Sequence, residues 1–341
     1  MTRRALFWSY DPELPSFRHR LAPLAAELER RGWSTAVDRF PKRRYLRRIL
    51  ERRRTLAAAD LLVYAKINLA PGERALLARL APPAVFDFDD ALWLRKPRRP
   101  GAPPGRSRFR ERKFAASCRA AGLALAGNEF LAARARRESA RVAVAPTGVD
   151  LAAYEAVPRA DDGRTVVWIG LPENLPYLAP IRPALARLAA TGAAVRLRVV
   201  SSAFPDWPEI PIERVEWSAA DEIAALSTAA IGVMPLADDD WSRGKCAFKL
   251  LQYMAAGLPA VASPVGQSAD VVIPEETGLW ARTADEWEAA LARLLASAEL
   301  RQRLGRAGRA VLRDRYEAAA IARRSADRIE RLLAGAAIDG R

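Results

Sequence analysis

Residues 241–266 read WSRGKCAFKLLQYMAAGLPAVASPVG, a cationic turn followed by a helical segment and a buried-type strand. The apolar run AAIGVMPL (229–236) comes before the turn, and Gly257 and Pro259 are stop signals that end the helix before the next apolar run. Strand, helix and strand in this order are typical of parallel sheets with crossover helices. The stretch therefore predicts an α/β fold.

The same alternation of short apolar runs and helical stretches extends over the whole chain. The runs of the first half are 5–10, 33–38, 59–66, 84–89, 122–127 and 141–146, and those of the second half are 165–170, 194–200, 212–217, 229–236, 259–263 and 277–281. We expect two doubly wound Rossmann-like domains, residues 1–150 and 151–315, that face each other across a cleft, and a C-terminal helix in 316–341 that packs back on the first domain. Ligands of such sheets bind beyond the carboxyl ends of the strands.

Lys245 and Lys249 stand at the expected start of the helix, where the helix dipole is also positive. Together with Gln252 they are spaced by four and three residues, which places the three side chains on one helix face. A bound diphosphate would satisfy both lysines and the free N–H groups of the first turn. The alternative is that the aspartates at 238–240 neutralise the lysines.

The positive charge of the chain lies entirely in its first half. Residues 1–150 contain 32 Lys+Arg against 15 Asp+Glu, a net charge of +17, whereas residues 151–341 contain 23 against 25. This asymmetry favours a polyanionic partner, either an anionic membrane or nucleic acid, although solvated arginines alone would give the same composition. The segment 39–54 predicts a basic amphipathic helix on anionic lipid, or else a surface helix with a core-facing stripe. The Pro-, Gly- and Arg-rich segment 95–113 predicts a loop at the cleft or membrane face.

The remaining composition excludes several classes of protein. Cys118, Cys246 and the single histidine, His19, form neither a disulfide framework nor a zinc motif. No G-x-x-x-x-G-K-[ST] motif is present, and no G-x-G-x-x-G follows the first apolar run. No run approaches the roughly 20 apolar residues of a membrane span, and the N-terminal apolar run is too short for a signal peptide. We expect a cytoplasmic protein, either free or attached at the inner membrane face.

In the quoted stretch 241–266 and in several other segments, the chain resembles retaining glycosyltransferases with the GT-B fold, specifically glycosyltransferase family 4. The block 231–266 is the most specific part of the resemblance, and TVVWIGLPENLPYLAPI (165–181) resembles the strand and turn that open the family's second domain. Further similar segments are SYDPELPSFRHR, AVFDFDDALW, ALAGNEFLA and VAPTGVDLAAY. The resemblance thus covers nearly the whole chain.

The resemblance implies a donor site for a nucleoside-diphosphate sugar. Its residues would be Gly170, Pro172, Asn174, Arg243, Gly244, Lys245, Lys249, Gln252, Pro264, Val265 and Gly266. Lys245 and Lys249 would hold the diphosphate, and Gln252 falls where many members have a glutamate that binds the ribose. Gly244 falls where many members have a glutamate that contacts the donor sugar, which leaves the sugar specificity open.

Three aspartates follow the apolar run at 84–89. We expect Asp89 or Asp90 to line the reacting side of the cleft, and with Lys245 they are the catalytic candidates. Asp87 and Asp89 form an Asp-x-Asp pattern that binds manganese in a different glycosyltransferase fold, but the pattern is short and the GT-B context argues against a metal. Alternatively, Asp89 or Asp90 caps the next helix.

Arg18 and Arg20 follow the first apolar run, where a ligand-facing loop is expected. They are candidates for contact with an acceptor or another group in the cleft, and a solvated helix start is the alternative. His19 fits a surface or packing role better than a catalytic one. Trp241 fits core packing, with stacking on a sugar as the alternative.

We therefore expect a retaining hexosyltransferase that moves a sugar from a nucleoside-diphosphate sugar to an acceptor glycan, either lipid-linked or part of the cell envelope. We expect no cofactor. No metal is strictly required, because preorganised cations and helix N–H groups stabilise the charge on the leaving phosphate. No nucleic acid partner is expected. The alternatives are a GT-B sugar-nucleotide epimerase or phosphorylase, and a non-catalytic basic binder of anionic lipid or nucleic acid. The sugar, the base and the acceptor stay open, with Ser201–Phe204 as the candidate base-binding region.

Overall fold

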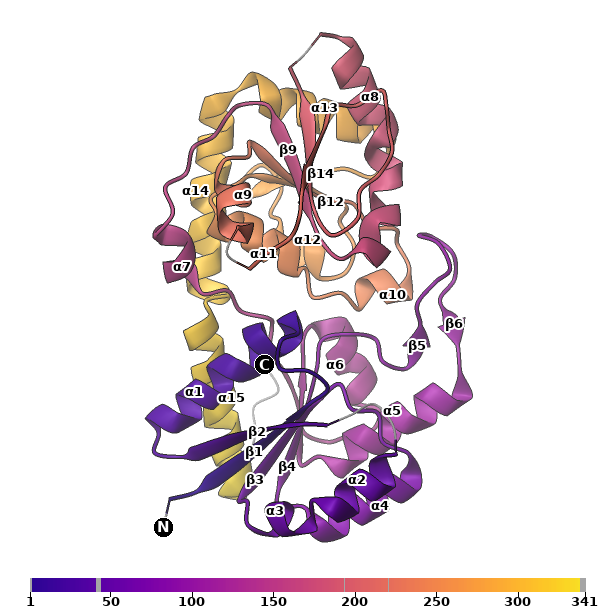
Figure 1. Cartoon of the computed structure of the whole chain (residues 1–341), viewed down its shortest axis with the longest axis vertical. Helices are drawn as coiled ribbons and strands as arrows, with labels where there is room; N and C mark the ends of the chain where they lie inside the picture. Colours follow the sequence, from indigo (N-terminus) through magenta and orange to yellow (C-terminus); the bar gives the residue numbers. More distant parts are fainter. Residues whose placement is uncertain (1, 41–43, 193, 220, 338–341) are drawn as a thin grey trace.

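Two six-stranded parallel sheets organise the chain in the computed structural model, which describes residues 2–40, 44–192, 194–219 and 221–337 (Figure 1). The first sheet has the order β2-β1-β3-β4-β7-β8 and consists of β1 (Arg4–Ser9), β2 (Ser34–Arg39), β3 (Leu61–Ala65), β4 (Ala84–Phe88), β7 (Leu123–Ala126) and β8 (Val142–Val144). The second has the order β11-β10-β9-β12-β13-β14 and consists of β9 (Thr165–Ile169), β10 (Arg196–Val200), β11 (Ile212–Val215), β12 (Ile231–Met234), β13 (Ala260–Ala262) and β14 (Gly278–Trp280). The predicted pair of doubly wound α/β sheets is confirmed.

Helices connect the parallel strands in both domains. Those of the first domain are a π-helical turn η1 (Phe17–Leu21), α1 (Ala22–Arg30), α2 (Tyr45–Glu51), α3 (Arg53–Ala57), α4 (Pro71–Leu80), α5 (Arg108–Ala120) and α6 (Glu129–Ala135). The second domain contains α7 (Leu151–Glu155), the 3₁₀ segment η2 (Pro172–Ile181), α8 (Arg182–Ala190), α9 (Glu222–Ser227), α10 (Asp240–Arg243), α11 (Phe248–Ala255), α12 (Gln267–Val271), α13 (Ala284–Ala296) and α14 (Ala298–Arg315).

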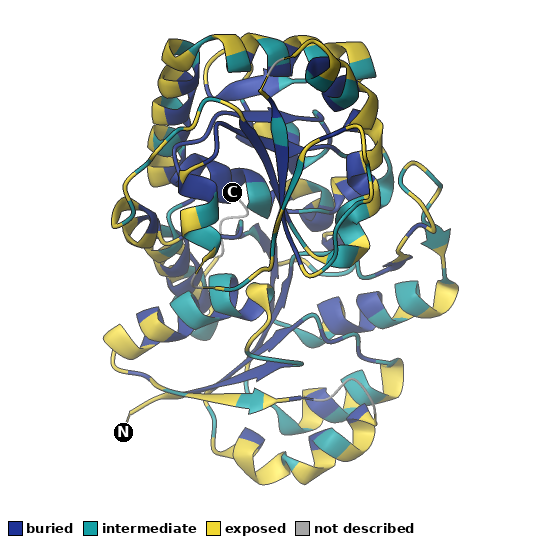
Figure 2. Cartoon of the chain, turned by 45° about the horizontal axis from the view of Figure 1, so that its top comes forward, coloured by how far each residue is buried: buried dark blue, intermediate teal, exposed yellow. Residues whose placement is uncertain are grey.

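The central strands are apolar along their whole length because helices cover both faces of each sheet. Every residue of β3, β4 and β9 is buried. Tyr64 and Phe86 pack on one face of the first sheet, while Val63 and Val85 pack on the other. Figure 2 shows the buried strands between helices whose outer faces are exposed.

The strand order locates one switch point in each sheet. In the second sheet the chain turns from β9 to β10 on one side and later to β12 on the other, so the crevice lies between β9 and β12. In the first sheet β2 and β3 flank β1, which places the crevice between β1 and β3. Both crevices open at the carboxyl ends of the strands, where ligands bind in this class of fold.

The C-terminal helix α15 (Ala318–Leu333) lies on the first domain, although α14 before it belongs to the second (Figure 1). Ala326 and Ile329 are part of the apolar core of the first domain. Arg31, after α1, forms salt bridges with Asp327 and Glu330 of α15. The expected C-terminal segment also includes residues 338–341, which lie outside the described part of the chain.

In the basic segment 39–54 the helix α2 and the start of α3 replace one continuous amphipathic helix; its residues 41–43 are not among those described. Tyr45 and Ile49 of α2 are buried in the core, whereas Leu46 is 50% and Leu50 is 47% exposed. The apolar residues of α2 therefore supply both a core-facing stripe and an outward apolar face. Within the described ranges, no helix combines the length and the apolar character needed to cross a bilayer.

Candidate active site between the two domains

Lys245 lies in the turn before α11, since the helix begins at Phe248. The predicted helix start is therefore three residues too early, because Ala247 has a left-handed conformation with a φ of 50° that separates the turn from the helix. The Nζ of Lys245 donates a hydrogen bond to Oδ1 of Asn174 at 3.4 Å and lies 5.3 Å from the centre of the Tyr177 ring. Burial lowers the pKa of Lys245. The turn thus presents a partly desolvated ammonium group to η2.

Lys249 occupies the first turn of α11 and points to the carboxyl end of β9. Its Nζ lies 5.2 Å from the centre of the Trp168 ring. A Cβ at Gly170 would stand 2.8 Å from the Cε of Lys249, so this lysine position requires a glycine after β9. Burial lowers the pKa of Lys249 to about 7, and the charge of Lys245 acts in the same direction. Both lysines therefore lie at the β9–β12 switch point.

The aspartates at 238–240 do not neutralise these lysines. Asp238 accepts from Nε of Arg243 at 2.8 Å, and Asp240 lies 3.5 Å from NH1 of the same guanidinium. Asp239 caps α10 by accepting from the backbone N–H of Ser242 at 2.8 Å. Among the described residues, no carboxylate is close enough to Lys245 or Lys249 to form a salt bridge. The alternative of neutralisation is wrong, and Arg243 is the cation that the aspartates hold.

Gln252 does not share a face with Lys245, because Lys245 precedes the helix. The Gln252 amide is buried and donates from Nε2 to Oε1 of Glu222 on α9 at 2.6 Å. The prediction of one common face is therefore wrong for Lys245 and Gln252. Glu222, which the sequence did not mark, supplies a carboxylate beside the predicted ribose contact.

The loop after β13 packs directly on the cationic turn. Gly266 has a φ of 53° at the N-cap of α12, and a Cβ there would stand 2.7 Å from the Cα of Arg243. Pro264 is half-buried and Val265 is buried. Gly244 lies against the first domain, where a Cβ would stand 2.9 Å from the Cβ of Ala91. The predicted donor loops are therefore brought together.

Asp89 and Asp90 lie at the carboxyl end of β4, and both form ion pairs with Lys66. The Nζ of Lys66 is 2.8 Å from Oδ1 of Asp89 and also pairs with Oδ2 of Asp90. Burial opposes ionisation of Asp89, but the charges of Lys66 and Arg20 outweigh it and lower its pKa. The sequence analysis missed Lys66, although a lysine directly after a buried apolar run is the signal that marks it.

Arg20 forms a buried ion pair with Asp87. Its Nε and NH2 donate to the two carboxylate oxygens at 2.9 Å and 2.6 Å, and its NH1 donates to the carbonyl of Ala145 at 2.7 Å. Only 8% of Arg20 is exposed, so the prediction of an acceptor contact is wrong for this residue. Because Asp87 holds Arg20 and Asp89 holds Lys66, both carboxylates of the Asp-x-Asp pattern already have cationic partners.

His19 contacts the second domain, and Arg18 precedes it in η1. Arg18 is half-buried. The ring of His19 packs against Phe248 of α11, with 4.5 Å between the ring centroids. Burial lowers the pKa of His19 to about 4, and the charge of Arg18 contributes. His19 is therefore a neutral packing histidine, as the sequence favoured.

A cavity of about 380 Å³ lies at the β1–β3 switch point of the first domain. Its lining includes Ser9 at the end of β1, Tyr10 after it, Lys66 after β3, Asp90, and Arg110 of α5. Trp241 of the second domain also lines the cavity. We call this space the β1–β3 cavity; it combines hydroxyl, carboxylate and cationic groups with an aromatic ring next to the cationic turn.

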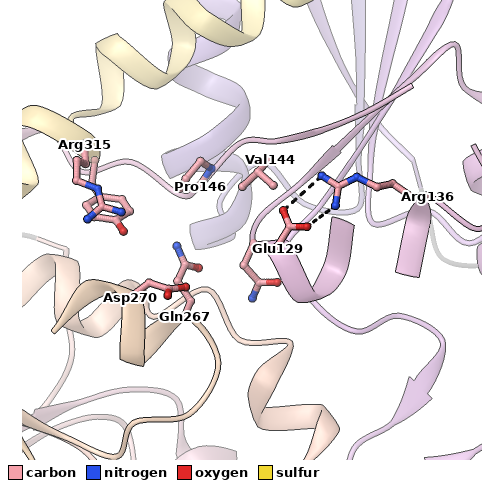
Figure 3. A pocket seen from close by; sticks show the side chains of 9 residues that line it. Glu129, Arg136, Val144, Pro146, Gln267, Asp270 and Arg315 are labelled. Carbon is pink, nitrogen blue, oxygen red and sulfur yellow. Dashed lines mark hydrogen bonds and ion pairs between the residues drawn. The ribbon is translucent and has the colours of Figure 1, made fainter. Parts of the chain in front are cut away.

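A larger cavity of about 520 Å³ lies between α6, α12 and the end of α14 (Figure 3). Glu129 and Arg136 form an ion pair on its first-domain side, and Gln267 and Asp270 lie opposite. The lining residues of this cavity do not include Lys245 or Lys249. The larger cavity therefore lacks the unpaired ammonium groups that mark the predicted donor site.

Hydrogen bonds join the two domains around the cationic turn. The Nδ2 of Asn128 donates to the carbonyls of Arg243 and Lys245, each at 3.1 Å, while its Oδ1 caps α6. Lys96 of the first domain donates from Nζ to the carbonyl of Glu173 at 2.7 Å. The sequence analysis missed both residues because nothing in their spacing indicates a partner in the other domain.

Comparisons with known proteins agree with this fold. Residues 180–327 match the family model described as glycosyl transferase-like. No curated protein matches the chain.

Solved structures match the chain over almost its whole length. Anabaena Alr3699/HepE in complex with UDP is 13% identical, with 97% of this chain and 100% of that chain covered and a TM-score of 0.69. Sucrose-phosphate synthase from Thermosynechococcus elongatus is 16% identical, with 98% and 100% covered and a TM-score of 0.71. A glycosyltransferase from Rickettsia africae ESF-5 is 11% identical, with 97% and 99% covered and a TM-score of 0.67.

The two parallel sheets, the cationic turn and these matches lead to one conclusion. The chain has the GT-B fold, and its residues 180–327 are similar to the family described as glycosyl transferase-like.

Proposed function

We propose that this chain is a retaining glycosyltransferase of the hexosyltransferase class, which moves a sugar from a nucleoside-diphosphate sugar to an acceptor held by the first domain. The observation that carries the proposal is the pair of ammonium groups, Lys245 and Lys249, at the β9–β12 switch point without a carboxylate partner among the described residues. A glycosyl transferase-like match over 180–327 supports the reaction class.

The positive charges of Lys245 and Lys249 complement the negative charge that develops on the leaving diphosphate during the transfer. Breaking the bond between a sugar and a diphosphate builds negative charge on the leaving phosphate, and preorganised cations stabilise that charge. The first turn of α11 adds backbone N–H groups, since its N-cap, Ala247, has no capping side chain. The neighbouring Anabaena protein was crystallised with UDP and with UDP-glucose, which supports a nucleotide-sugar as donor.

The same lysines argue for a transfer that does not depend on a metal. In the Asp-x-Asp pattern Asp87 pairs with Arg20, and Asp89 pairs with Lys66. We therefore propose that Lys245 and Lys249, and not a metal held by these aspartates, neutralise the leaving diphosphate. Retention would follow from attack on the same face that the diphosphate leaves, with the leaving phosphate accepting the proton of the acceptor hydroxyl.

The acceptor is proposed to bind in the β1–β3 cavity. Asp90 lines this cavity and can accept a hydrogen bond from the attacking hydroxyl, while Asp89 holds Lys66 in place. The ring of Trp241 forms part of the wall and can stack on the apolar face of a sugar. A carbohydrate acceptor fits this lining, because hydroxyl, carboxylate and aromatic groups are its usual partners.

We further propose that the acceptor is lipid-linked and that the first domain docks on an anionic membrane. Its net charge of +17 supplies the attraction to anionic lipid. Leu46 and Leu50 of α2 and Phe109 of α5 are 50%, 47% and 68% exposed. Arginines adjoin Leu46 and Phe109 in the sequence, and Leu50 lies two residues from the nearest arginines. Exposed apolar residues among cations suit the interface between headgroups and acyl chains.

A donor screen tests the reaction class. UDP-, GDP- and ADP-sugars would be titrated into the wild type, Lys245→Ala/Lys249→Ala and the control Arg306→Ala, whose side chain is exposed on α14. We expect at least one donor to bind wild type and control equally and the double variant at least tenfold more weakly. Binding of no nucleotide by the wild type, with tight and salt-sensitive DNA binding, would instead support the non-catalytic binder.

The anomeric configuration of the product tests the stereochemistry. NMR of the first product formed from an α-linked donor should show an α-linkage. A β-linked first product would disprove retention and leave the donor assignment intact.

A further inference from the structure

The ribbon formed by β5 (Leu94–Arg95) and β6 (Gly105–Arg106) extends from the first domain toward the second, beside α10 (Figure 1). It belongs to the basic segment 95–113 that the sequence placed at the cleft or membrane face. Lys96 follows β5 directly and reaches the second domain. The ribbon therefore brings a first-domain cation to the edge of the predicted donor site.

Lys96 and Lys245 contact adjacent residues of the same turn. Lys96 donates from Nζ to the carbonyl of Glu173 at 2.7 Å. The next residue, Asn174, accepts from Nζ of Lys245 at 3.4 Å through its side chain. Because both contacts fall at the start of η2, the two ammonium groups approach the turn after β9 from opposite domains.

This arrangement brings together three lysine side chains, Lys96, Lys245 and Lys249, that form no salt bridge with a carboxylate among the described residues. No salt bridge to Lys96 occurs within the described residues, and the exposed Glu173 is the carboxylate whose charge acts on both Lys96 and Lys249. Burial lowers the pKa of Lys245, the charges of Asp90 and Asp239 oppose this shift, and the charge of Lys96 adds to it. Like charges in a partly desolvated site cost free energy unless an anion joins them, and such conflicts are typical of functional sites.

We propose that Lys96 is a third cation for the donor diphosphate, supplied by the first domain when the two domains are closed. This inference rests on the proposed nucleotide-sugar donor and adds a donor contact from outside the glycosyl transferase-like region at 180–327. Because Lys96 and Lys245 belong to different domains, a diphosphate between them couples donor binding to domain closure. The carbonyl of Glu173 holds the Lys96 ammonium in place before the donor arrives.

Three substitutions test whether Lys96 acts through its charge on the diphosphate or only through its hydrogen bond to the other domain. Lys96→Gln keeps a donor for the Glu173 carbonyl but removes the charge, Lys96→Arg keeps the charge, and Arg98→Gln removes an equal charge from an exposed position on the same ribbon. Each variant would be titrated by calorimetry with UDP, GDP or ADP, whichever the wild type binds best, and with the corresponding nucleoside.

We expect Lys96→Gln to bind the nucleoside diphosphate about tenfold more weakly, with nucleoside affinity unchanged. Lys96→Arg should stay within about threefold of the wild type, and Arg98→Gln should match the wild type. The salt dependence of diphosphate binding should also be weaker in Lys96→Gln than in Arg98→Gln.

Two results would overturn the inference while leaving the donor assignment intact. The first is diphosphate binding by Lys96→Gln at wild-type affinity. The second is an equal loss of affinity for the nucleoside diphosphate and for the nucleoside. This result would mean that Lys96 only holds the two domains together and does not contact the phosphates. Failure of the wild type to bind any nucleoside diphosphate would instead remove the proposed function itself.

Discussion

Gly127 of the first domain and Cys246 of the second pack so closely that a Cβ on Gly127 would overlap with the Sγ of Cys246. The same Cβ would stand 3.1 Å from the Cα of Asp89, and the thiol of Cys246 donates to the carbonyl of Asp89 at 3.3 Å. A residue beside the cationic turn therefore rests directly on the strand end that carries the candidate catalytic aspartates. The absence of a side chain at position 127 sets the distance between the two halves of the site.

Substitution Gly127→Ala should separate the domains without unfolding them. The new methyl group overlaps with the Sγ of Cys246, so the cationic turn must move away from Asp89. We expect transfer activity to fall at least tenfold and the radius of gyration from small-angle scattering to increase. Gly72→Ala is the control, because a Cβ there meets no atom within 4 Å. Full activity of Gly127→Ala at an unchanged radius would show that this contact does not set the site.

Donor binding should take up a proton through Lys249. Burial lowers the pKa of this lysine to about 7 in the free protein, so at pH 8 most of its ammonium is deprotonated. A bound diphosphate raises the pKa again and recruits a proton. Calorimetry at pH 8 in buffers of different ionisation enthalpy should therefore show net proton uptake. Lys249→Met should abolish the uptake, and equal uptake by the variant would assign the proton to another group.

The same lysine should give the free protein a pH-dependent stability. The pKa of Lys249 is about 7 in the folded state and near the ordinary lysine value in the unfolded state, so the unfolded chain binds more protons between these two values. The contribution of Lys249 to stability therefore rises with pH above about 7. In urea denaturation, Lys249→Met should be more stable than the wild type at pH 6.5, with a smaller difference at pH 9. A difference that does not change with pH would contradict the lowered pKa.

Lys66 should stabilise the fold as well as the site. Lys66→Met removes the common ion-pair partner of Asp89 and Asp90 and leaves two neighbouring carboxylates without it. We expect the free energy of unfolding to fall by roughly 1–3 kcal/mol and the activity to be lost. Lys66→Met/Asp90→Asn, which removes one of the two charges, should recover part of the stability but not the activity. No recovery would mean that charge pairing is not the cause.

Vesicle binding should depend on the exposed leucines of α2. Leu46→Glu/Leu50→Glu replaces two exposed apolar side chains by carboxylates, so the fold should tolerate the change. Sedimentation with anionic vesicles should show at least tenfold weaker binding of this variant. Arg306→Glu makes an equal change of net charge on the second domain and serves as the control. Equal partitioning of both variants would dismiss α2 as a membrane contact.

The sequence determined the sheets and the position of the cationic turn. Short runs bounded by Gly, Pro and polar residues marked all twelve strands of the two sheets, and burial on both faces makes the central strands apolar along their length. The charges of Lys245 and Lys249 were equally visible, because two cations near the positive end of a helix dipole can be recognised from the local sequence.

Only the tertiary structure decided which of these groups meet. Lys66 pairs with Asp89, Lys96 reaches Glu173, and Gln252 bonds Glu222, although each pair is separated by many residues. Local spacing fixes which residues share a helix face or a strand end, but the partner across a sheet edge or between domains depends on strand order and domain closure. For the same reason Arg20, which looked like a free cation after the first strand, is instead held by Asp87 in the core.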